Sequence, residues 1–217
     1  MDKKSLLLYG ITDRGCLPRG KSLTQAVLEA IEGGITMLQL REKELKGEDL
    51  KNLARELLLI CRKHDIPFII NDDAELCRII DADGVHVGQE DMAPLEARRI
   101  IGPGKIVGVT AKTVEQAENA VKNGAEYLGS GALFGSSTKK DAIYMTRETF
   151  IDIIRSVDIP VVGIGGINED NASLLTGTGA AGIAVVSSIF GQEDIRGAAE
   201  RLRKTAEKIA EDIAEEK

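Results

Sequence analysis

Hydroxyl and ammonium groups are concentrated in residues 131–146, which read GALFGSSTKKDAIYMT. The stretch follows a short apolar run and contains two adjacent serines, Thr138 and two adjacent lysines. Hydroxyls, ammonium groups and the free backbone N–H groups of a glycine-containing loop are suited to a phosphorylated ligand. The alternative is an ordinary surface loop, which often has the same composition. The stretch therefore predicts a phosphate site only in combination with the rest of the chain.

A second polar segment follows the apolar residues Met37 and Leu38 and reads QLREK from Gln39 to Lys43. Alternate side chains of an extended strand share a face, so we expect Gln39, Arg41 and Lys43 on one side and Leu40 on the other. Cations placed in this way could bind an anion. The alternative is the exposed, charged end of a strand.

Carboxylates follow the next two apolar runs. Asn71, Asp72 and Asp73 come directly after residues 67–70, and Glu90 and Asp91 follow residues 84–87. Asp73 is suited to cap a following helix, but capping does not account for the second aspartate. Two carboxylates on neighbouring strand ends can share one Mg²⁺, which prefers oxygen ligands and takes others from substrate phosphates. Glu90 is the weaker candidate for that role.

Glycine and serine residues mark the last two apolar runs, with GIGGI at Gly163–Ile167 and VVSS at Val185–Ser188. Backbone N–H groups contributed after strands seven and eight form the recurring phosphate site of eight-stranded α/β barrels. Glycine pairs alone also make tight turns, so the two segments together indicate phosphate binding. Thr110, at the end of the fifth run, could donate to a phosphate or begin a turn.

Covalent or histidine-based catalysis has little support, because the chain has two histidines and no Cys or Ser paired as a nucleophile. His86 lies within an apolar run and is expected to be packed, and His64 is expected at a helix end. A cation cluster and a phosphate cup remain. They suit a reaction in which a phosphate group leaves and a second phosphorylated molecule attacks.

Short apolar runs alternate with helical periodicity along the chain, and a charged amphipathic helix is expected from about residue 196 to 214. Strands alternating with helices imply parallel pairing with right-handed crossovers. We predict a (β/α)8 TIM barrel, with residues 1–217 as one domain and the polar segments at the carboxyl ends of the strands. A doubly wound open sheet is the alternative. The expected strands are Leu6–Ile11, Thr36–Leu40, Pro67–Ile70, Gly84–Val87, Ile106–Val109, Tyr127–Gly129, Pro160–Ile164 and Ile183–Val186.

Composition narrows the classes of partner. A net charge of -7 and 3% aromatic residues with no Trp argue against nucleic acid as a ligand. No apolar run is long enough to span a membrane, and the three cysteines form no CxxC pair. We therefore expect reduced thiols in a cytoplasmic protein without a membrane partner. The oligomeric state is left open, a homo-oligomer included.

Taken together, these segments resemble the thiamine-phosphate synthase family over nearly the whole chain. It is their order and spacing, rather than any one segment, that makes the resemblance specific. The matching segments are YGITD at Tyr9–Asp13, QLREK at Gln39–Lys43, NDD at Asn71–Asp73, GVHVGQED at Gly84–Asp91, GVTAKT at Gly108–Thr113, LFGSSTKKDA at Leu133–Ala142, GIGGI at Gly163–Ile167 and VVSSIF at Val185–Phe190.

The resemblance implies a transferase that couples a hydroxymethylpyrimidine diphosphate to a hydroxyethylthiazole phosphate, or to its carboxylated precursor. Pyrophosphate is released and thiamine phosphate is formed. The implied mechanism is dissociative, with Mg²⁺ as the cofactor: the diphosphate leaves, the electron-rich aminopyrimidine carries the carbocation, and the thiazole nitrogen captures it. No general base is needed, in agreement with the shortage of histidines.

The resemblance also implies roles for individual residues. Arg41, Lys43 and Lys139 would be catalytic cations that stabilise the departing diphosphate, and Asp72 and Asp91 would hold Mg²⁺. Gln39 and Thr110 would lie at the pyrimidine. The wider substrate-binding set is Gln39, Leu40, Arg41, Glu42, Lys43, Asn71, Thr110, Ser136, Ser137, Thr138, Lys139, Gly166, Val186 and Ser187, in which Ser136 to Thr138 and the last three residues would meet the thiazole phosphate.

Three residues of the 131–146 stretch depart from the family pattern. Ala132 and Gly135 stand where proline is frequent, and Ser136 stands where threonine is frequent. The serine keeps the hydroxyl, whereas the glycine makes the loop more flexible.

Two other functions compete with the synthase. A related barrel isomerase that tautomerises the thiazole phosphate carboxylate would need no diphosphate or metal site, yet the residues for both are present. A non-catalytic phosphate sensor would have no use for the two metal carboxylates.

Overall fold

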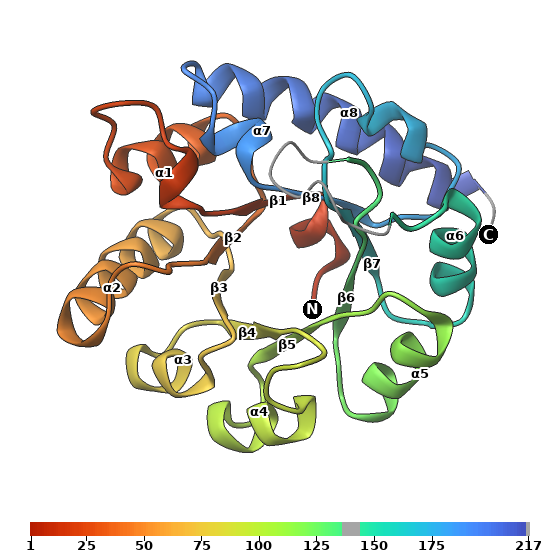
Figure 1. The fold of residues 1–217 in the computed structure, drawn as a ribbon, viewed down its shortest axis with the longest axis horizontal. Coiled ribbons are helices and arrows are strands. Elements are labelled where there is room, and N and C mark those ends of the chain that lie inside the picture. Colours follow the sequence, from red (N-terminus) through yellow and green to blue (C-terminus); the bar gives the residue numbers. More distant parts are fainter. Residues whose placement is uncertain (136–143, 216–217) are drawn as a thin grey trace.

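The computed structural model of the chain describes residues 1–135 and 144–215. Eight parallel strands, each paired with the next and the last with the first, form a closed barrel (Figure 1). The predicted (β/α)8 barrel is confirmed, and the open-sheet alternative is wrong. The strands are β1 (Leu8–Ile11), β2 (Met37–Leu40), β3 (Phe68–Asn71), β4 (Gly84–Val87), β5 (Ile106–Thr110), β6 (Tyr127–Ser130), β7 (Val161–Ile164) and β8 (Gly182–Val185).

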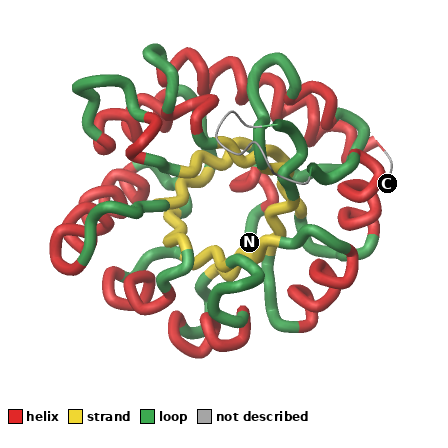
Figure 2. Tube along the Cα trace, in the orientation of Figure 1, coloured by secondary structure: helices red, strands yellow, loops and turns green. Residues whose placement is uncertain are grey.

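Helices surround the barrel as an outer ring (Figure 2). They are α1 (Leu23–Glu32), α2 (Gly47–Lys63), α3 (Ala74–Ile80), α4 (Pro94–Ile101), α5 (Val114–Lys122), α6 (Arg147–Arg155), α7 (Ser187–Phe190) and α8 (Ile195–Glu215), with the short 3-10 helices η1 (Lys3–Leu6), η2 (Arg14–Cys16) and η3 (Ala172–Leu175). Within the described residues, the crossover from β7 to β8 contains η3 in place of a full α-helix. Gly165, Gly166, Gly177 and Gly179 of this crossover have positive φ angles, which a right-handed helix does not accommodate.

Side chains alternate between the inside and the outside of the barrel, as the period of a strand requires. Tyr9, Met37 and Tyr127 belong to a small buried cluster inside the barrel, whereas Leu8 and Leu40 belong to the larger core between the strands and the helices. Gln39 faces inward and Leu40 outward, which confirms the predicted alternation for these two residues, whereas Arg41 and Lys43 lie beyond the end of β2.

Local capping follows the sequence. The Oδ1 of Asp73 accepts a hydrogen bond from the backbone N–H of Leu76 at 2.8 Å, so this aspartate caps α3 as predicted. His64 is the C-terminal cap residue of α2, also as predicted. Because Asp73 is occupied by this capping bond, Asp72 is the residue of the pair that remains to be explained.

The two ends of the barrel differ. At the amino-terminal end, η1 packs against the barrel and contributes Leu6 to the inner cluster, so this end of the barrel interior is covered. The opposite end is formed by the loops that follow the strands, where polar residues gather. No helix in residues 1–135 and 144–215 is long and apolar enough to cross a membrane.

Candidate functional site

Cations gather around the carboxylate of Asp13 at the carboxyl ends of β1 and β2. Arg41 Nη1 donates to Asp13 Oδ2 at 3.3 Å, and Lys43 Nζ lies 3.8 Å from the same oxygen. Arg41 is half-buried and Lys43 is exposed. The structure thus brings the two predicted cations, Arg41 and Lys43, together at the carboxylate of Asp13. Asp13 was not among the site residues predicted from the sequence. The available signal was the position of Asp13 in the loop that follows the first strand, two residues after Ile11.

The start of the Arg41 loop is fixed by Thr12, whose side chain is fully buried. The backbone N–H of Arg41 donates to Thr12 Oγ1 at 2.9 Å, and this hydroxyl donates back to the carbonyl of Arg41 at 3.2 Å. A single hydroxyl therefore satisfies both main-chain groups of the residue that carries the guanidinium.

We expect Thr12→Val to lower the free energy of unfolding by about 1–3 kcal/mol, because the isosteric side chain leaves both main-chain groups of Arg41 without a buried partner. The loss would be measured by denaturant titration. Thr12→Ser keeps the hydroxyl and should stay close to the wild type; an equal loss in both variants would assign the effect to packing of the methyl group.

Glu42 has a supporting position. Arg14 donates to Glu42 Oε2 through Nε at 3.0 Å and Nη2 at 2.8 Å, and the backbone N–H of Glu44 donates to Oε1 at 2.8 Å. Burial alone would raise the pKa of Glu42, but these hydrogen bonds outweigh it and lower the pKa. With its side chain 2% exposed, this anion holds the loop that carries Arg41 and Lys43.

Two carboxylates face each other at the ends of β3 and β4. Burial, followed by the negative charge of Asp91 and a hydrogen bond between the two carboxyl groups, raises the pKa of Asp72 to about 6. Asp91 Oδ2 accepts from the backbone N–H of Gly88 at 2.9 Å. Asp72 has the left-handed backbone conformation, with φ of 62°, and its N–H donates to the carbonyl of His86 at 2.8 Å. Non-glycine residues rarely adopt this conformation, which is enriched at functional sites.

This pair fits a magnesium ion. Two negatively charged carboxylates placed close together repel each other, and a bound cation offsets this electrostatic repulsion. No group of three or more His, Cys, Asp or Glu that could hold a metal occurs in the described part of the chain. An ion held by two carboxylates would keep its other positions for water and substrate phosphates, which is the preference of Mg²⁺.

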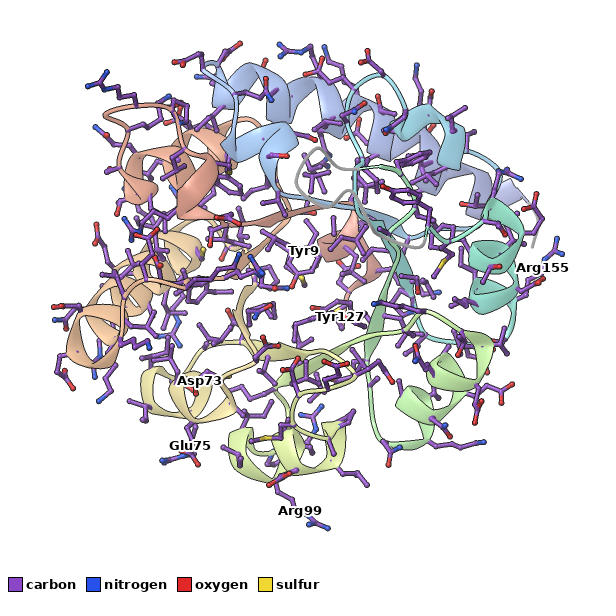
Figure 3. All side chains as sticks on the ribbon, in the orientation of Figure 1. Tyr9, Asp73, Glu75, Arg99, Tyr127 and Arg155 are labelled. Carbon is purple, nitrogen blue, oxygen red and sulfur yellow. The ribbon has the colours of Figure 1, made fainter. Side chains whose placement is uncertain are left out.

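Predicted pyrimidine contacts lie at the inner wall of the barrel. Gln39 projects inward from β2 and is 2% exposed, and Thr110 ends β5 with its side chain half-buried. Between them lie Tyr9, Tyr127 and His86, and Figure 3 shows both tyrosines inside the ring of strands. Burial raises the pKa of both phenols and lowers the pKa of His86 to about 4. The tyrosines were missed from sequence, although a phenol in a barrel interior needs a polar partner.

The turn after β7 has a main chain that only glycine accommodates easily. Gly165 and Gly166 have φ angles of 95° and 69°. A Cβ on Gly166 would lie 2.3 Å from the carbonyl oxygen of Phe134, so the turn packs against the segment that follows β6. Asn171 Nδ2 donates to the carbonyl of Gly166 at 2.9 Å. The Gly166 turn is therefore held from both sides.

The end of β8 lies beside this turn. Val186 is the N-terminal cap residue of α7, and Ser187 is the exposed first residue of that helix. Ser188 Oγ donates to the carbonyl of Ile167, which joins the start of α7 to the glycine turn. The structure thus brings the predicted phosphate-cup residues after β7 and β8 together.

Some predicted residues are not in this group. The Leu40 side chain is buried among the outer helices, so its only approach to a substrate is through its main chain. Ser136, Ser137, Thr138 and Lys139 lie outside the described residues. The flanks of that segment are joined by a hydrogen bond of 2.8 Å from the N–H of Met145 to the carbonyl of Ala132.

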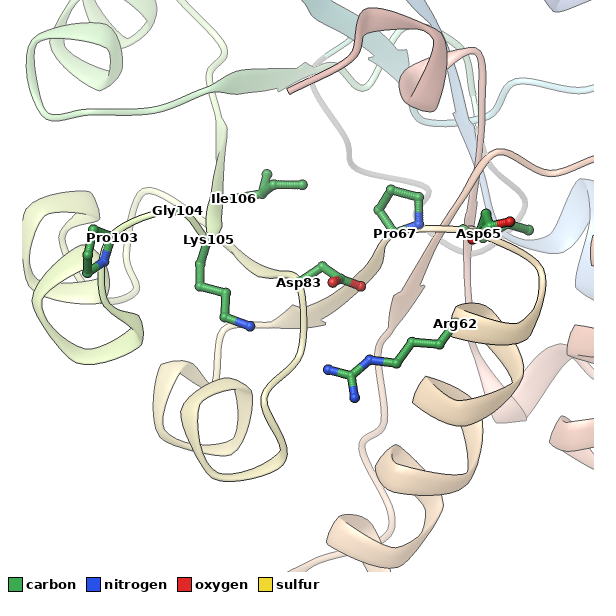
Figure 4. Close-up of a pocket in the computed structure, with 9 residues that line it drawn as sticks. Arg62, Asp65, Pro67, Asp83, Pro103, Gly104, Lys105 and Ile106 are labelled. Atoms are coloured by element: carbon green, nitrogen blue, oxygen red, sulfur yellow. The ribbon is translucent and has the colours of Figure 1, made fainter.

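A surface hollow of about 490 Å³ lies at the other end of the barrel, at the starts of β4 and β5 (Figure 4). Arg62 and Lys105 line it and both pair with Asp81, at 2.9 Å and 2.5 Å. The amino-terminal end of a TIM barrel carries stability rather than catalysis. We therefore place the candidate active site at the carboxyl end.

Comparison with known proteins agrees with this arrangement. Residues 8–189 match the family described as thiamine monophosphate synthase. The chain belongs to the thiamine monophosphate synthase family. The predicted family membership, and with it the transferase class, is therefore confirmed.

Individual relatives in this family cover almost the whole chain. The thiamine-phosphate synthase of Ruminiclostridium cellulolyticum is 49% identical over 195 residues, which span 90% of this chain and 92% of the relative. The thiamine-phosphate synthase of Pyrococcus furiosus is 42% identical over 207 residues, spanning 95% and 98%. A solved structure of thiamine phosphate pyrophosphorylase from Pyrococcus furiosus superposes with a TM-score of 0.86 at 40% identity, covering 95% of this chain and 98% of that one.

Proposed function

We propose that this chain transfers the aminopyrimidinylmethyl group from its diphosphate to the nitrogen of a thiazole phosphate, releasing pyrophosphate and forming thiamine phosphate. The observation that carries the proposal is the arrangement at the carboxyl ends of β1 to β4. There, Arg41 and Lys43 lie at one carboxylate, and Asp72 and Asp91 face each other. Cations beside a pair of carboxylates suit a leaving diphosphate that arrives with Mg²⁺.

In this mechanism Arg41 and Lys43, together with Lys139, hold the diphosphate and stabilise the negative charge that develops as the C–O bond breaks. Asp72 and Asp91 would hold Mg²⁺, and the ion would supply further neutralisation of the charge on the leaving group. Asn71, which ends β3 beside Asp72, would contact the same group. Because the departing group is stabilised by fixed charges, the reaction needs no proton transfer to it.

The pyrimidine would lie over the inner wall formed by Gln39 and Thr110. Its amino group donates electron density to the ring, and this stabilises the cation left after the diphosphate departs. The thiazole phosphate would be held by Gly166, Val186 and Ser187 together with Ser136 to Thr138, which directs the thiazole nitrogen at the cation. A closed cavity would exclude water and so prevent hydrolysis of the cation.

The isomerase alternative needs only the phosphate cup. The isomerase would not use the cations at Asp13 or the facing carboxylates of Asp72 and Asp91, so their presence favours the transferase.

Incubating the purified protein with both substrates and Mg²⁺ should yield thiamine phosphate, detected by mass spectrometry. Tautomerisation of a thiazole phosphate carboxylate, supplied alone and without formation of thiamine phosphate, would support the isomerase instead.

We also infer that the chain acts in the cytoplasm. Cys16, Cys61 and Cys77 are free thiols, as expected in a reducing compartment. Both proposed substrates are phosphorylated small molecules.

A further inference from the structure

A continuous row of hydrogen bonds crosses the inside of the barrel from β2 to β5. Gln39 Nε2 donates to the Tyr9 hydroxyl at 2.5 Å, and this hydroxyl lies 2.8 Å from that of Tyr127. The Tyr127 hydroxyl lies 2.9 Å from His86 Nδ1, and His86 Nε2 lies 3.0 Å from Thr110 Oγ1. The row therefore joins the two proposed pyrimidine contacts, Gln39 and Thr110, through three residues to which no role has been given above.

With the Gln39 amide oriented so that Nε2 donates to Tyr9, the direction of donation along the rest of the row follows from the number of protons. Tyr9 accepts from Gln39, so its own proton is left for the oxygen of Tyr127. Tyr127 must then donate to His86 Nδ1, because a phenol has one proton. A neutral imidazole that accepts at Nδ1 carries its proton on Nε2, and it donates that proton to Thr110. The hydroxyl proton of Thr110 is consequently free.

The other end of the row is fixed by the same count. Tyr9 has no proton left for Gln39 Oε1. Gln39 donates to Tyr9 through Nε2, and among the described residues Ser130 Oγ is the one fully buried side-chain oxygen or nitrogen without a hydrogen-bond partner. Gln39 Oε1 is therefore not completely enclosed, and it is the group of this side chain that can accept a hydrogen bond from a ligand.

Glycines in the neighbouring strands make room for the row. A Cβ on Gly108 of β5 would lie 2.1 Å from Tyr127 Cζ, so the phenol lies directly against bare main chain. A Cβ on Gly129 of β6 would lie 3.4 Å from His86 Cε1. The rings of Tyr9 and Tyr127 are 5.9 Å apart and meet edge to face, a favourable aromatic arrangement. Packing thus holds the rings at hydrogen-bonding distance.

We propose that Tyr9, Tyr127 and His86 are positioning residues that fix the hydrogen-bonding character of the pyrimidine site, with Gln39 Oε1 as an acceptor and the Thr110 hydroxyl as a donor. The inference rests on the proposed function for the identity of the ligand. An aminopyrimidine has an exocyclic amine that donates and ring nitrogens that accept. A wall with an acceptor at one side and a donor at the other favours one orientation of such a ring and disfavours a ring with the opposite pattern.

The protonated nitrogen of His86 can be measured directly in the ligand-free protein. Because the chain has two histidines, His64 and His86, ¹⁵N-histidine NMR gives two ring systems, and His86→Gln assigns them. We expect His86 near pH 7 to be protonated at Nε2 and unprotonated at Nδ1. Protonation at Nδ1, in either the other tautomer or the imidazolium, would reverse or interrupt the row and overturn the proposal.

Tyr127→Phe tests whether the row matters to the substrate. The ring should occupy the same glycine-lined space, while His86 Nδ1 loses its donor and both tautomers become populated. We expect the KM for the pyrimidine diphosphate to rise roughly 3- to 10-fold, the loss typical of one or two hydrogen bonds, with the KM for the thiazole phosphate within about twofold. Equal changes in both constants, or no change in either, would contradict a positioning role.

Met37→Leu is the matched control, because Met37 is fully buried in the same inner cluster but makes no hydrogen bond in the row. It should leave both KM values and the His86 nitrogen signals unchanged. The NMR measurement and the kinetic measurements together also separate the positioning role from the proposed function. Absence of thiamine phosphate formation would leave the NMR result intact, whereas Nδ1 protonation in an active synthase would overturn the positioning role alone.

Discussion

Replacing Asp91 by asparagine should lower kcat by roughly 10²- to 10³-fold, the loss expected when several kcal/mol of metal-assisted charge stabilisation disappear. The affinity for the thiazole phosphate should change little, because the proposed cup lies after β7 and β8. Asparagine keeps one oxygen to accept from the N–H of Gly88, so the loop should remain folded. Steady-state kinetics at saturating Mg²⁺ and a thiazole phosphate titration would measure the two quantities.

Glu90→Gln is the control for Asp91→Asn. Glu90 is an exposed carboxylate one residue away, and nothing places it opposite Asp72. It should retain kcat within about twofold, as surface substitutions usually do. If Asp91→Asn reduced turnover and thiazole phosphate binding equally, the carboxylate would be supporting the whole site rather than a metal ion.

Arg41→Ala should lower kcat/KM for the pyrimidine diphosphate by roughly 10²- to 10³-fold, since a charge-assisted contact to the departing group is worth several kcal/mol in the transition state. Arg41→Lys should recover part of that loss, because it restores the charge without the two-pronged geometry of a guanidinium. Steady-state kinetics with the pyrimidine diphosphate varied would give both values.

Arg62→Ala supplies the comparison for Arg41→Ala. Arg62 also pairs with an aspartate, Asp81, but at the amino-terminal end of the barrel, so its removal should leave kcat/KM nearly unchanged. A similar loss in both variants would mean that the substrate is drawn by the general charge of the protein. It would then contradict a direct contact from Arg41.

The barrel itself could be predicted because its signals are local. Each buried strand is a short apolar run, and the predicted and observed bounds of Gly84–Val87 coincide. Others differ by one or two residues, as for Leu8–Ile11 against the expected Leu6–Ile11, where η1 takes up the first residues of the run. The capping roles of Asp73 and His64 were also local and were confirmed.

Contacts that depend on closure of the barrel could not be read from the sequence. Tyr9 and Tyr127 are 118 positions apart, and their hydrogen bond exists because β1 and β6 face each other across the interior. Asp13 caps the short helix η2 through one carboxylate oxygen, and its other oxygen accepts a hydrogen bond from Arg41, which lies 28 positions away. Strand alternation correctly placed Gln39 and Leu40 on opposite faces of β2, but it does not reveal that Glu42, beyond the end of the strand, is engaged by Arg14.

Release of pyrophosphate, measured with each component omitted in turn, tests the proposed transfer most directly. With the pyrimidine diphosphate, the thiazole phosphate and Mg²⁺ all present, we expect one pyrophosphate for each thiamine phosphate formed. Omitting the thiazole phosphate or chelating the metal should abolish sustained release. Pyrophosphate released at the full rate without the thiazole phosphate, or thiamine phosphate formed at the full rate without Mg²⁺, would contradict a metal-assisted transfer between the two substrates.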